Sequence, residues 1–177
     1  MKKLKALALM LIVPIILSGC ISAKDSNEDT KYEKDFGTYE VQSGWIEEKA
    51  HSTNDVFFYV KKGTEKDSQP NNIAISEGKN KFKISEHEDF EKAIMGQLQA
   101  QMPKNSDVKI ESEGIVTTNN NRVFVVTIKE KSLETKFYYI MGDYKFVMVQ
   151  ATCFNDENDV YKVSDYMVNS FVWNEEQ

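Results

Sequence analysis

The stretch RVFVVTIKEKSLETKFYYIMGDYKFVMVQA, residues 122–151, decides the fold of this chain. It holds three apolar runs, Arg122 to Glu130, Phe137 to Met141 and Lys145 to Ala151. These runs are rich in β-branched and aromatic residues, which favour strands. Gly142-Asp143 places a tight turn between the second run and the third. The stretch therefore predicts consecutive antiparallel strands.

The middle strands carry apolar side chains at successive positions, as in Val123 to Val126 and Phe146 to Val149. A strand that is apolar on both faces must be covered on both faces. Before these strands, Val108 to Val116 alternates partly between apolar and charged residues, and TTNNN at 117–121 predicts a turn because Asn tolerates positive φ. We expect a central four-stranded antiparallel meander with a further layer on each face.

A long helix is predicted in the middle of the chain. Ser85 and Glu88 have the spacing of a capping box, in which each side chain accepts a hydrogen bond from the other residue's backbone N–H. The helix stops before Pro103, since the residue before proline disfavours helical geometry. Apolar residues recur every fourth position along it, at Phe90, Ile94, Leu98 and Met102.

Short strands and a second helix complete the predicted fold. Phe36 to Val41, Val56 to Val60 and Ile73 to Ser76 read as strands, with a turn at Gly44-Trp45 and a polar loop at 61–72. A C-terminal helix is indicated by the helical spacing of Val160, Val163, Met167 and Phe171. Its N-cap is Asp159, and it ends near Ser170-Phe171.

The predicted fold class is α+β. We expect an α/β/α sandwich with a central, mainly antiparallel sheet, one long middle helix and a C-terminal helix. A cystatin-like fold, or another fold with one helix on a sheet, is the alternative.

The N-terminus has the pattern of a secretory signal peptide. Lys2, Lys3 and Lys5 precede an uncharged, mostly apolar run of 12 residues, Ala6 to Leu17. A membrane-spanning helix needs about 20 apolar residues, so this run is too short to span a bilayer but has the length of a signal-peptide core.

Leu17-Ser18-Gly19-Cys20 closes the apolar run and resembles the lipobox of bacterial lipoproteins. The resemblance implies cleavage between Gly19 and Cys20 and a diacylglyceryl group on the Cys20 thiol. Two acyl chains anchor a protein stably. We therefore expect a lipid anchor that places the protein at the cell membrane, on its extracytoplasmic face.

Three segments follow from these signals. Residues 1–19 form the signal peptide, and residues 20–35 form the lipidated Cys20 and a flexible tether, because their charged, apolar-poor composition does not bury enough surface to become ordered. Residues 36–177 form a single α+β domain, a length typical of one domain.

The charge of the chain disfavours two classes of partner. It has 22 basic and 28 acidic residues, a net charge of −6, and loss of the three signal-peptide lysines makes this −9. An acidic domain argues against nucleic acid and against electrostatic adhesion to anionic lipid.

Few residues of this chain carry catalytic or metal-binding chemistry. His51 reads as a surface residue, His87 as a solvated residue of the first helical turn, and Cys153 as a small buried hydrophobe. The acidic run NDENDVY at 155–161 lacks the register of a calcium loop. We expect no catalytic residue, no metal and no cofactor.

The aromatic residues give one hint of an interface. Tyr138 and Tyr139 point to opposite faces of one strand, so one of them is expected to line a surface groove. Aromatic side chains with a polar tip suit protein interfaces.

Residues 36–173 resemble the superfamily of PsbP-like photosystem subunits and Ran-binding Mog proteins. The resemblance rests on Gly44-Trp45, the helix from Ser85 to Met102, Asn119 to Arg122 before a long strand, the FYYIM and KFVMV pair, and the closing Ser170-Phe171. Ser43 stands where relatives often have proline. The resemblance implies a domain that acts by docking on larger proteins.

The sequence thus leads to a membrane-anchored extracytoplasmic lipoprotein that works as a non-enzymatic protein-interaction module. Its protein partner is unknown. Two alternatives remain open: a small-ligand or solute-binding lipoprotein, and an envelope enzyme with an unrecognised site.

Overall fold

The computed structural model describes residues 28–102, 107–131, 133–154 and 159–174, and its main element is a seven-stranded sheet. All of its pairings are antiparallel. The strand order is β3 (Trp45–Glu47), β4 (Val56–Lys61), β5 (Asn72–Lys79), β9 (Lys145–Cys153), β8 (Leu133–Gly142), β7 (Arg122–Glu130) and β6 (Lys109–Val116). The predicted meander is therefore confirmed as β6 to β9.

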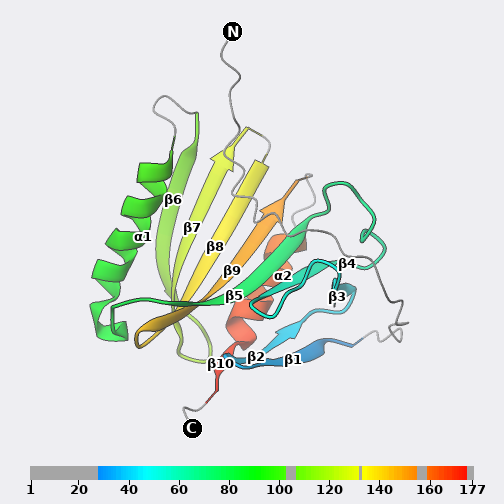
Figure 1. Cartoon of the computed structure of the whole chain (residues 1–177), viewed down its shortest axis with the longest axis horizontal. Coiled ribbons are helices and arrows are strands. Elements are labelled where there is room, and N and C mark those ends of the chain that lie inside the picture. The colour runs from blue at the N-terminus through cyan, green and yellow to red at the C-terminus, as the bar shows by residue number, and fades with distance from the viewer. Residues whose placement is uncertain (1–27, 103–106, 132, 155–158, 175–177) are drawn as a thin grey trace.

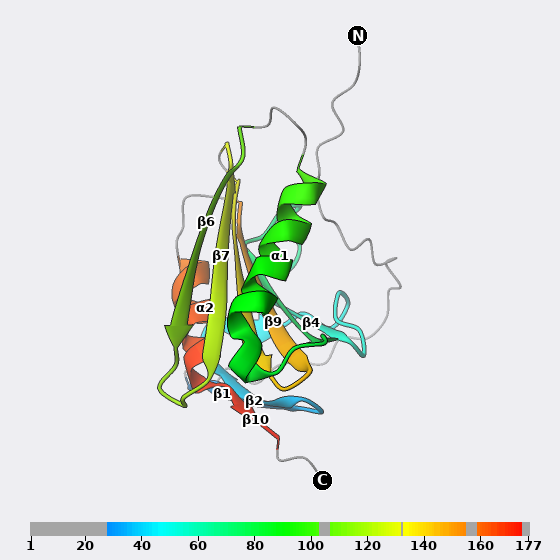
Figure 2. The same cartoon turned by 90° about the vertical axis from the view of Figure 1, so that its left-hand side faces the viewer.

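Two helices lie on opposite faces of this sheet (Figures 1 and 2). The helix α1 (His87–Gln101) covers one face, and α2 (Asp159–Ser170) covers the other. A second, three-stranded sheet of order β1 (Thr30–Lys34), β2 (Gly37–Val41) and β10 (Val172–Trp173) packs beside α2. The predicted α+β fold with an α/β/α arrangement is confirmed.

The sheet separates two apolar cores, because its middle strands alternate their large residues between the faces. Along β7, Val123 and Val125 face α2, while Phe124 and Val126 face α1. On the α1 side the buried cluster is Phe90, Phe124, Val126, Phe137, Tyr139 and Met141. The expectation that both faces of these strands are covered is therefore correct.

The helix α1 begins differently from the prediction. The hydrogen bond of a capping box runs from the backbone N–H of Lys83 to Glu86 Oε2, 2.9 Å, around a 3₁₀ turn at Ile84–Glu86. Glu86 is the N-cap of α1, and no side chain caps it there. The Ser85–Glu88 capping box was thus wrong, because the short 3₁₀ turn shifts the helix start.

The tether prediction was wrong at its C-terminal end. Residues 30–34 form β1, paired with β2 from Thr30↔Val41 to Lys34↔Gly37. Tyr32 holds this charged strand, since its ring stacks on Tyr39 at 5.9 Å and meets Tyr59 edge-on at 5.1 Å. The ordered domain therefore begins before residue 36.

Other strands also differ from the prediction. The short strands β3 and β10 were not predicted, and β8 begins at Leu133 rather than Phe137. The strand β5 also extends beyond the predicted Ile73 to Ser76, to Lys79. The strand β10 can lie close to β2 because residue 37 is glycine. A Cβ at this position would lie 2.5 Å from the Val172 carbonyl oxygen. Among the described residues, no helix is long and apolar enough to cross a membrane.

Candidate functional site

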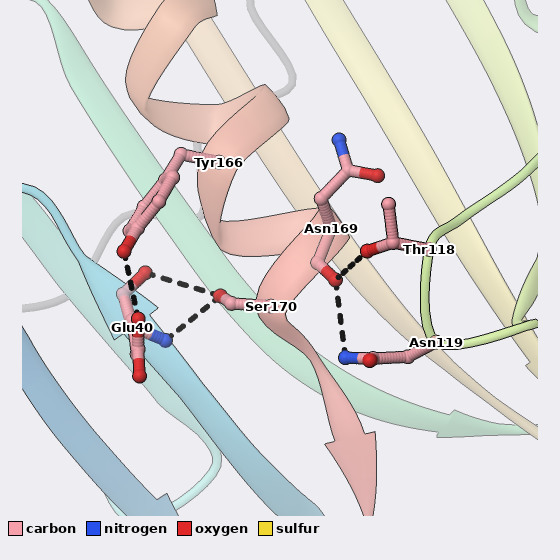
Figure 3. A pocket seen from close by; sticks show the side chains of 6 residues that line it. All are labelled: Glu40, Thr118, Asn119, Tyr166, Asn169 and Ser170. Carbon is pink, nitrogen blue, oxygen red and sulfur yellow. Dashed lines mark hydrogen bonds between the residues drawn. The ribbon is translucent and has the colours of Figure 1, made fainter.

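An open polar groove of about 350 Å³ lies at the C-terminal end of α2 (Figure 3). Three parts of the chain build it: the strand β2, the turn at 117–121 between β6 and β7, and the last two turns of α2. Its lining residues are Glu40, Thr118, Asn119, Tyr166, Asn169 and Ser170.

The asparagine turn closes one side of the groove by capping α2. Asn119 Nδ2 donates to the carbonyl oxygens of Asn169, 3.1 Å, and Phe171, 3.2 Å. Asn121 Nδ2 donates to the Phe171 oxygen at 2.8 Å. The last carbonyls of a helix have no partner within the helix, and they carry its negative dipole end. Amide N–H groups supplied by the turn satisfy them.

The turn itself depends on a left-handed residue. Asn120 has φ 60°, a conformation that asparagine tolerates better than most residues. This conformation lets Asn119 and Asn121 both reach α2. The predicted TTNNN turn is confirmed.

The other side of the groove is fixed by Glu40. Tyr166 Oη donates to Glu40 Oε2 at 2.7 Å, and the backbone N–H of Glu40 donates to Ser170 Oγ at 2.9 Å. Hydrogen bonding to the Glu40 carboxylate raises the pKa of Tyr166, because the neutral phenol is the form that donates. Tyr166 therefore stays protonated at neutral pH.

This arrangement holds several polar groups in fixed positions on an open surface. Its hydroxyl, carboxylate and amide groups are held by hydrogen bonds within the protein, and the groove is open to solvent.

The structure does not bring the predicted chemistry-bearing residues together. His51 lies exposed in the β3–β4 loop and contacts Glu48. His87 begins α1, with Nδ1 3.5 Å from Glu91 Oε1, and Cys153 is 5% exposed at the end of β9. The interpretation of Cys153 as a small buried residue is confirmed.

No group of three or more metal-ligating residues exists among the described residues. Of the acidic run, residues 155–158 lie outside the described part of the chain. Asp159 begins α2 and pairs with Lys61, with 2.9 Å between Oδ2 and Nζ. The predicted cleavage and lipidation site, Gly19 and Cys20, also lies outside the described residues.

The expected tyrosine interface was wrong. Tyr138 is 2% exposed and Tyr139 is 6% exposed, because α2 and α1 cover the two faces of β8. Tyr138 Oη donates to Asp165 Oδ1 at 2.6 Å, so its polar end is satisfied inside the protein.

A second hollow, of about 230 Å³, lies on the α2 side of the sheet at β6 and β7. Its lining residues are Glu111, Ser112, Glu113, Val125 and Thr127. Binding sites for small molecules are usually concave and mainly apolar. Both hollows are open and mainly polar, which does not favour the small-ligand alternative.

Sequence reasoning missed one exposed feature. Tyr144 is 52% exposed at the tip of the β8–β9 hairpin, and Ile84 is 42% exposed beside it. The available signal was a tyrosine in a two-residue turn, where Gly or Asn is usual, together with the alternating lysines at residues 79–83.

No family model and no curated protein matches the sequence. Solved structures do. The cyanobacterial PsbP protein of Synechocystis sp. PCC 6803 matches with a TM-score of 0.55 and 12% identity, over 88% of this chain and 98% of that one. A protein from Bacteroides thetaiotaomicron matches with a TM-score of 0.50 and 12% identity, over 85% of this chain and 50% of that one. The fold is therefore PsbP-like.

Proposed function

We propose that this protein is a membrane-anchored extracytoplasmic lipoprotein that works by docking on another protein, without covalent chemistry. The lipid on Cys20 attaches it to the extracytoplasmic face of the cell membrane. The domain then presents its surface to a protein partner, and neither a metal, a cofactor nor nucleic acid takes part.

The observation that carries the docking proposal is the groove at the end of α2. Its polar groups are held in place by bonds such as Tyr166–Glu40 and Asn119–Asn169, and they line an open surface. Preorganised polar groups lose little freedom on binding, which favours recognition of another protein. The PsbP-like fold agrees with this proposal, since that resemblance implies docking on larger proteins.

The anchoring proposal rests on the sequence alone. A basic start, a run of 12 mostly apolar residues and LSGC follow one another within the first 20 residues. An anchored domain meets membrane-bound partners at a raised effective concentration. Anchoring and docking are therefore parts of one proposal.

Complementation of cells that lack the gene tests both parts. The first variant, Cys20→Ala, should lose palmitate label and restore the phenotype only weakly, because the domain is no longer held near its partner. The second variant replaces His51, His87 and Cys153 with Ala together and should complement fully, provided that circular dichroism shows a native fold.

Cys153→Ala alone is the matched control for labelling, since it removes a cysteine that is buried. It should keep the palmitate label. A released Cys20→Ala domain with full function, together with a folded but inactive triple variant, would favour an envelope enzyme instead.

A further inference from the structure

Three exposed lysines gather at one end of the molecule. Lys79 ends β5, and Lys81 and Lys83 lie in the segment that leads to α1. This segment runs beside the β8–β9 hairpin, to which it is hydrogen-bonded. The exposed Tyr144 lies at the tip of the hairpin, and the exposed Ile84 follows the segment. We call the surface formed by Lys79, Lys81, Lys83, Ile84 and Tyr144 the lysine tip.

The lysine tip has a fixed backbone. Tyr144 donates its N–H to the Phe82 oxygen at 2.8 Å, and its own oxygen accepts from Asn80 N–H at 2.9 Å. The Ile84 N–H donates to Asp143 Oδ1 at 2.8 Å. Because these three bonds join the hairpin to the neighbouring segment, the exposed side chains project from a rigid base.

Tyr144 occupies a costly conformation. Its φ of 61° is left-handed, although its ring is large and 52% exposed. Residues other than Gly, Asn and Asp rarely adopt this region, and strain of this kind is concentrated at functional sites. A glycine or asparagine would suit the turn better, and the tyrosine ring makes only a long contact in return, with Lys83 Nζ 5.9 Å from the ring centroid.

The charges of the lysine tip are also unfavourable for the isolated protein. Lys79 pairs directly across from Lys145 in the β5–β9 register, where like charges are unfavourable, and Lys145 places its Nζ over the Trp173 ring, 4.9 Å from the centroid. Within the described residues, Lys79, Lys81 and Lys83 form no salt bridge. The nearby carboxylates of Asp143 and Glu86 already accept backbone N–H groups.

We propose that the lysine tip binds an acidic segment of a protein partner. The lysines pair with carboxylates of that segment, and Tyr144 and Ile84 contact its apolar side chains. This proposal rests on the proposed docking function and adds the chemistry of the partner. Positive charge in a chain of net charge −6 directs such a partner to this end of the molecule.

A narrow protein segment fits the lysine tip better than an anionic membrane. The exposed Glu88 and Asp89 follow directly in the first turn of α1. A flat anionic surface that reached the lysines would also be repelled by these carboxylates. A single peptide segment contacts the lysines alone.

A peptide titration tests the proposal on the purified full chain in neutral detergent. The probe is a short fluorescent peptide of alternating Glu and Phe, and its counterpart of alternating Lys and Phe should not bind. Replacing Lys79, Lys81 and Lys83 with Glu should weaken Glu–Phe binding about tenfold, as expected for three exposed charge pairs.

The matched control replaces three exposed lysines elsewhere, Lys49, Lys66 and Lys162, with Glu. It changes the net charge equally and should leave peptide affinity within about twofold, since exposed charges beyond a Debye length are largely screened. An equal loss in both triple variants, or no binding by the wild type, would overturn the proposal.

Tyr144→Gly separates binding from folding. It removes the strained side chain, so the melting temperature should stay the same or rise, while the peptide affinity falls. A merely structural tyrosine would give the reverse, with lower stability and unchanged affinity, and that result would count against the proposal.

A photo-crosslinking residue in place of Tyr144 tests the surface in intact cells, beside a second at Asn169 in the groove. We expect a protein adduct from position 144 that disappears in the Lys79, Lys81 and Lys83 variant. Phospholipid adducts alone would overturn the proposal in favour of a membrane surface. An adduct from Asn169 without one from Tyr144 overturns only the lysine tip, whereas no protein adduct from either site also overturns the docking function.

Discussion

At the scale of residues, the asparagine turn shows how far sequence patterns reach. TTNNN predicts a turn, and the positive φ of Asn120 confirms the reason. The same pattern does not reveal that Asn119 and Asn121 cap a helix end some 50 positions later. That contact depends on how α2 packs on the sheet, which no local pattern records.

Asn121→Ala should lower the free energy of unfolding by about 1–2 kcal/mol. It removes the 2.8 Å donor to the Phe171 oxygen, which keeps only the longer hydrogen bond from Asn119 at 3.2 Å. Urea denaturation measures the loss. The control is Asn120→Gly, which keeps the positive φ and the Asn121 donor and should cost almost nothing. A loss in Asn121→Ala no larger than in this control would contradict the capping role of Asn121.

At the scale of elements, strong periodicity was a reliable guide and short edge strands were not. Residues 122–130 form β7 as predicted, because their apolar run is long and is buried on both faces. The strands β3 and β10 have only three and two residues, too few for a pattern, and β1, with the sequence TKYEK, is mostly charged. Tertiary contacts stabilise them, such as Tyr32 on Tyr39 and β10 against Gly37.

The helix α1 shows the same limit in its packing. The prediction that Phe90, Ile94 and Leu98 face the sheet is confirmed. Only Phe90 is fully buried, however, at 1% exposed, and its ring meets Phe82, Tyr139 and Phe146. Ile94 and Leu98 are only partly buried, so α1 is attached mainly at its first turn.

Phe90→Ala should therefore cost about 3–5 kcal/mol of unfolding free energy, the range for large buried aromatics. Leu98→Ala should cost clearly less, because its side chain is partly exposed and leaves a smaller cavity. Chemical denaturation of the two variants side by side measures the difference. Equal costs would mean that α1 is held along its whole length.

At the scale of the whole molecule, buried tyrosines should set the alkaline limit of stability. Burial raises the pKa of Tyr39, Tyr59, Tyr138 and Tyr139, and that of Tyr139 rises from 10.0 to about 12. Above pH 10.0 the unfolded chain loses these phenol protons while the folded chain keeps them, so rising pH favours unfolding.

The free energy of unfolding should thus show no loss from these phenols below pH 10.0 and should fall steeply between pH 10.0 and about 12. Urea denaturation at a series of pH values measures it, and ultraviolet absorbance reports tyrosinate. If these tyrosines ionised near pH 10.0 while circular dichroism still showed a native fold, the buried positions of their rings would be contradicted.

The location of the groove could not be predicted from sequence patterns. Glu40, Thr118 and Tyr166 come from three distant parts of the chain, and only the packing of α2 between the two sheets brings them together. Residues such as His51 and His87, which draw attention in the sequence by their chemistry, lie elsewhere. The proposed docking function therefore rests on a surface rather than on a motif.

Photo-crosslinking from Asn169 in intact cells tests the central claim most directly, because it reports docking and anchoring together. The account predicts one discrete protein adduct in the wild type and a much weaker adduct in Cys20→Ala, where the raised effective concentration at the membrane is lost. An adduct of equal strength in both proteins would contradict the role of the anchor, and no protein adduct from this surface would contradict docking at the groove.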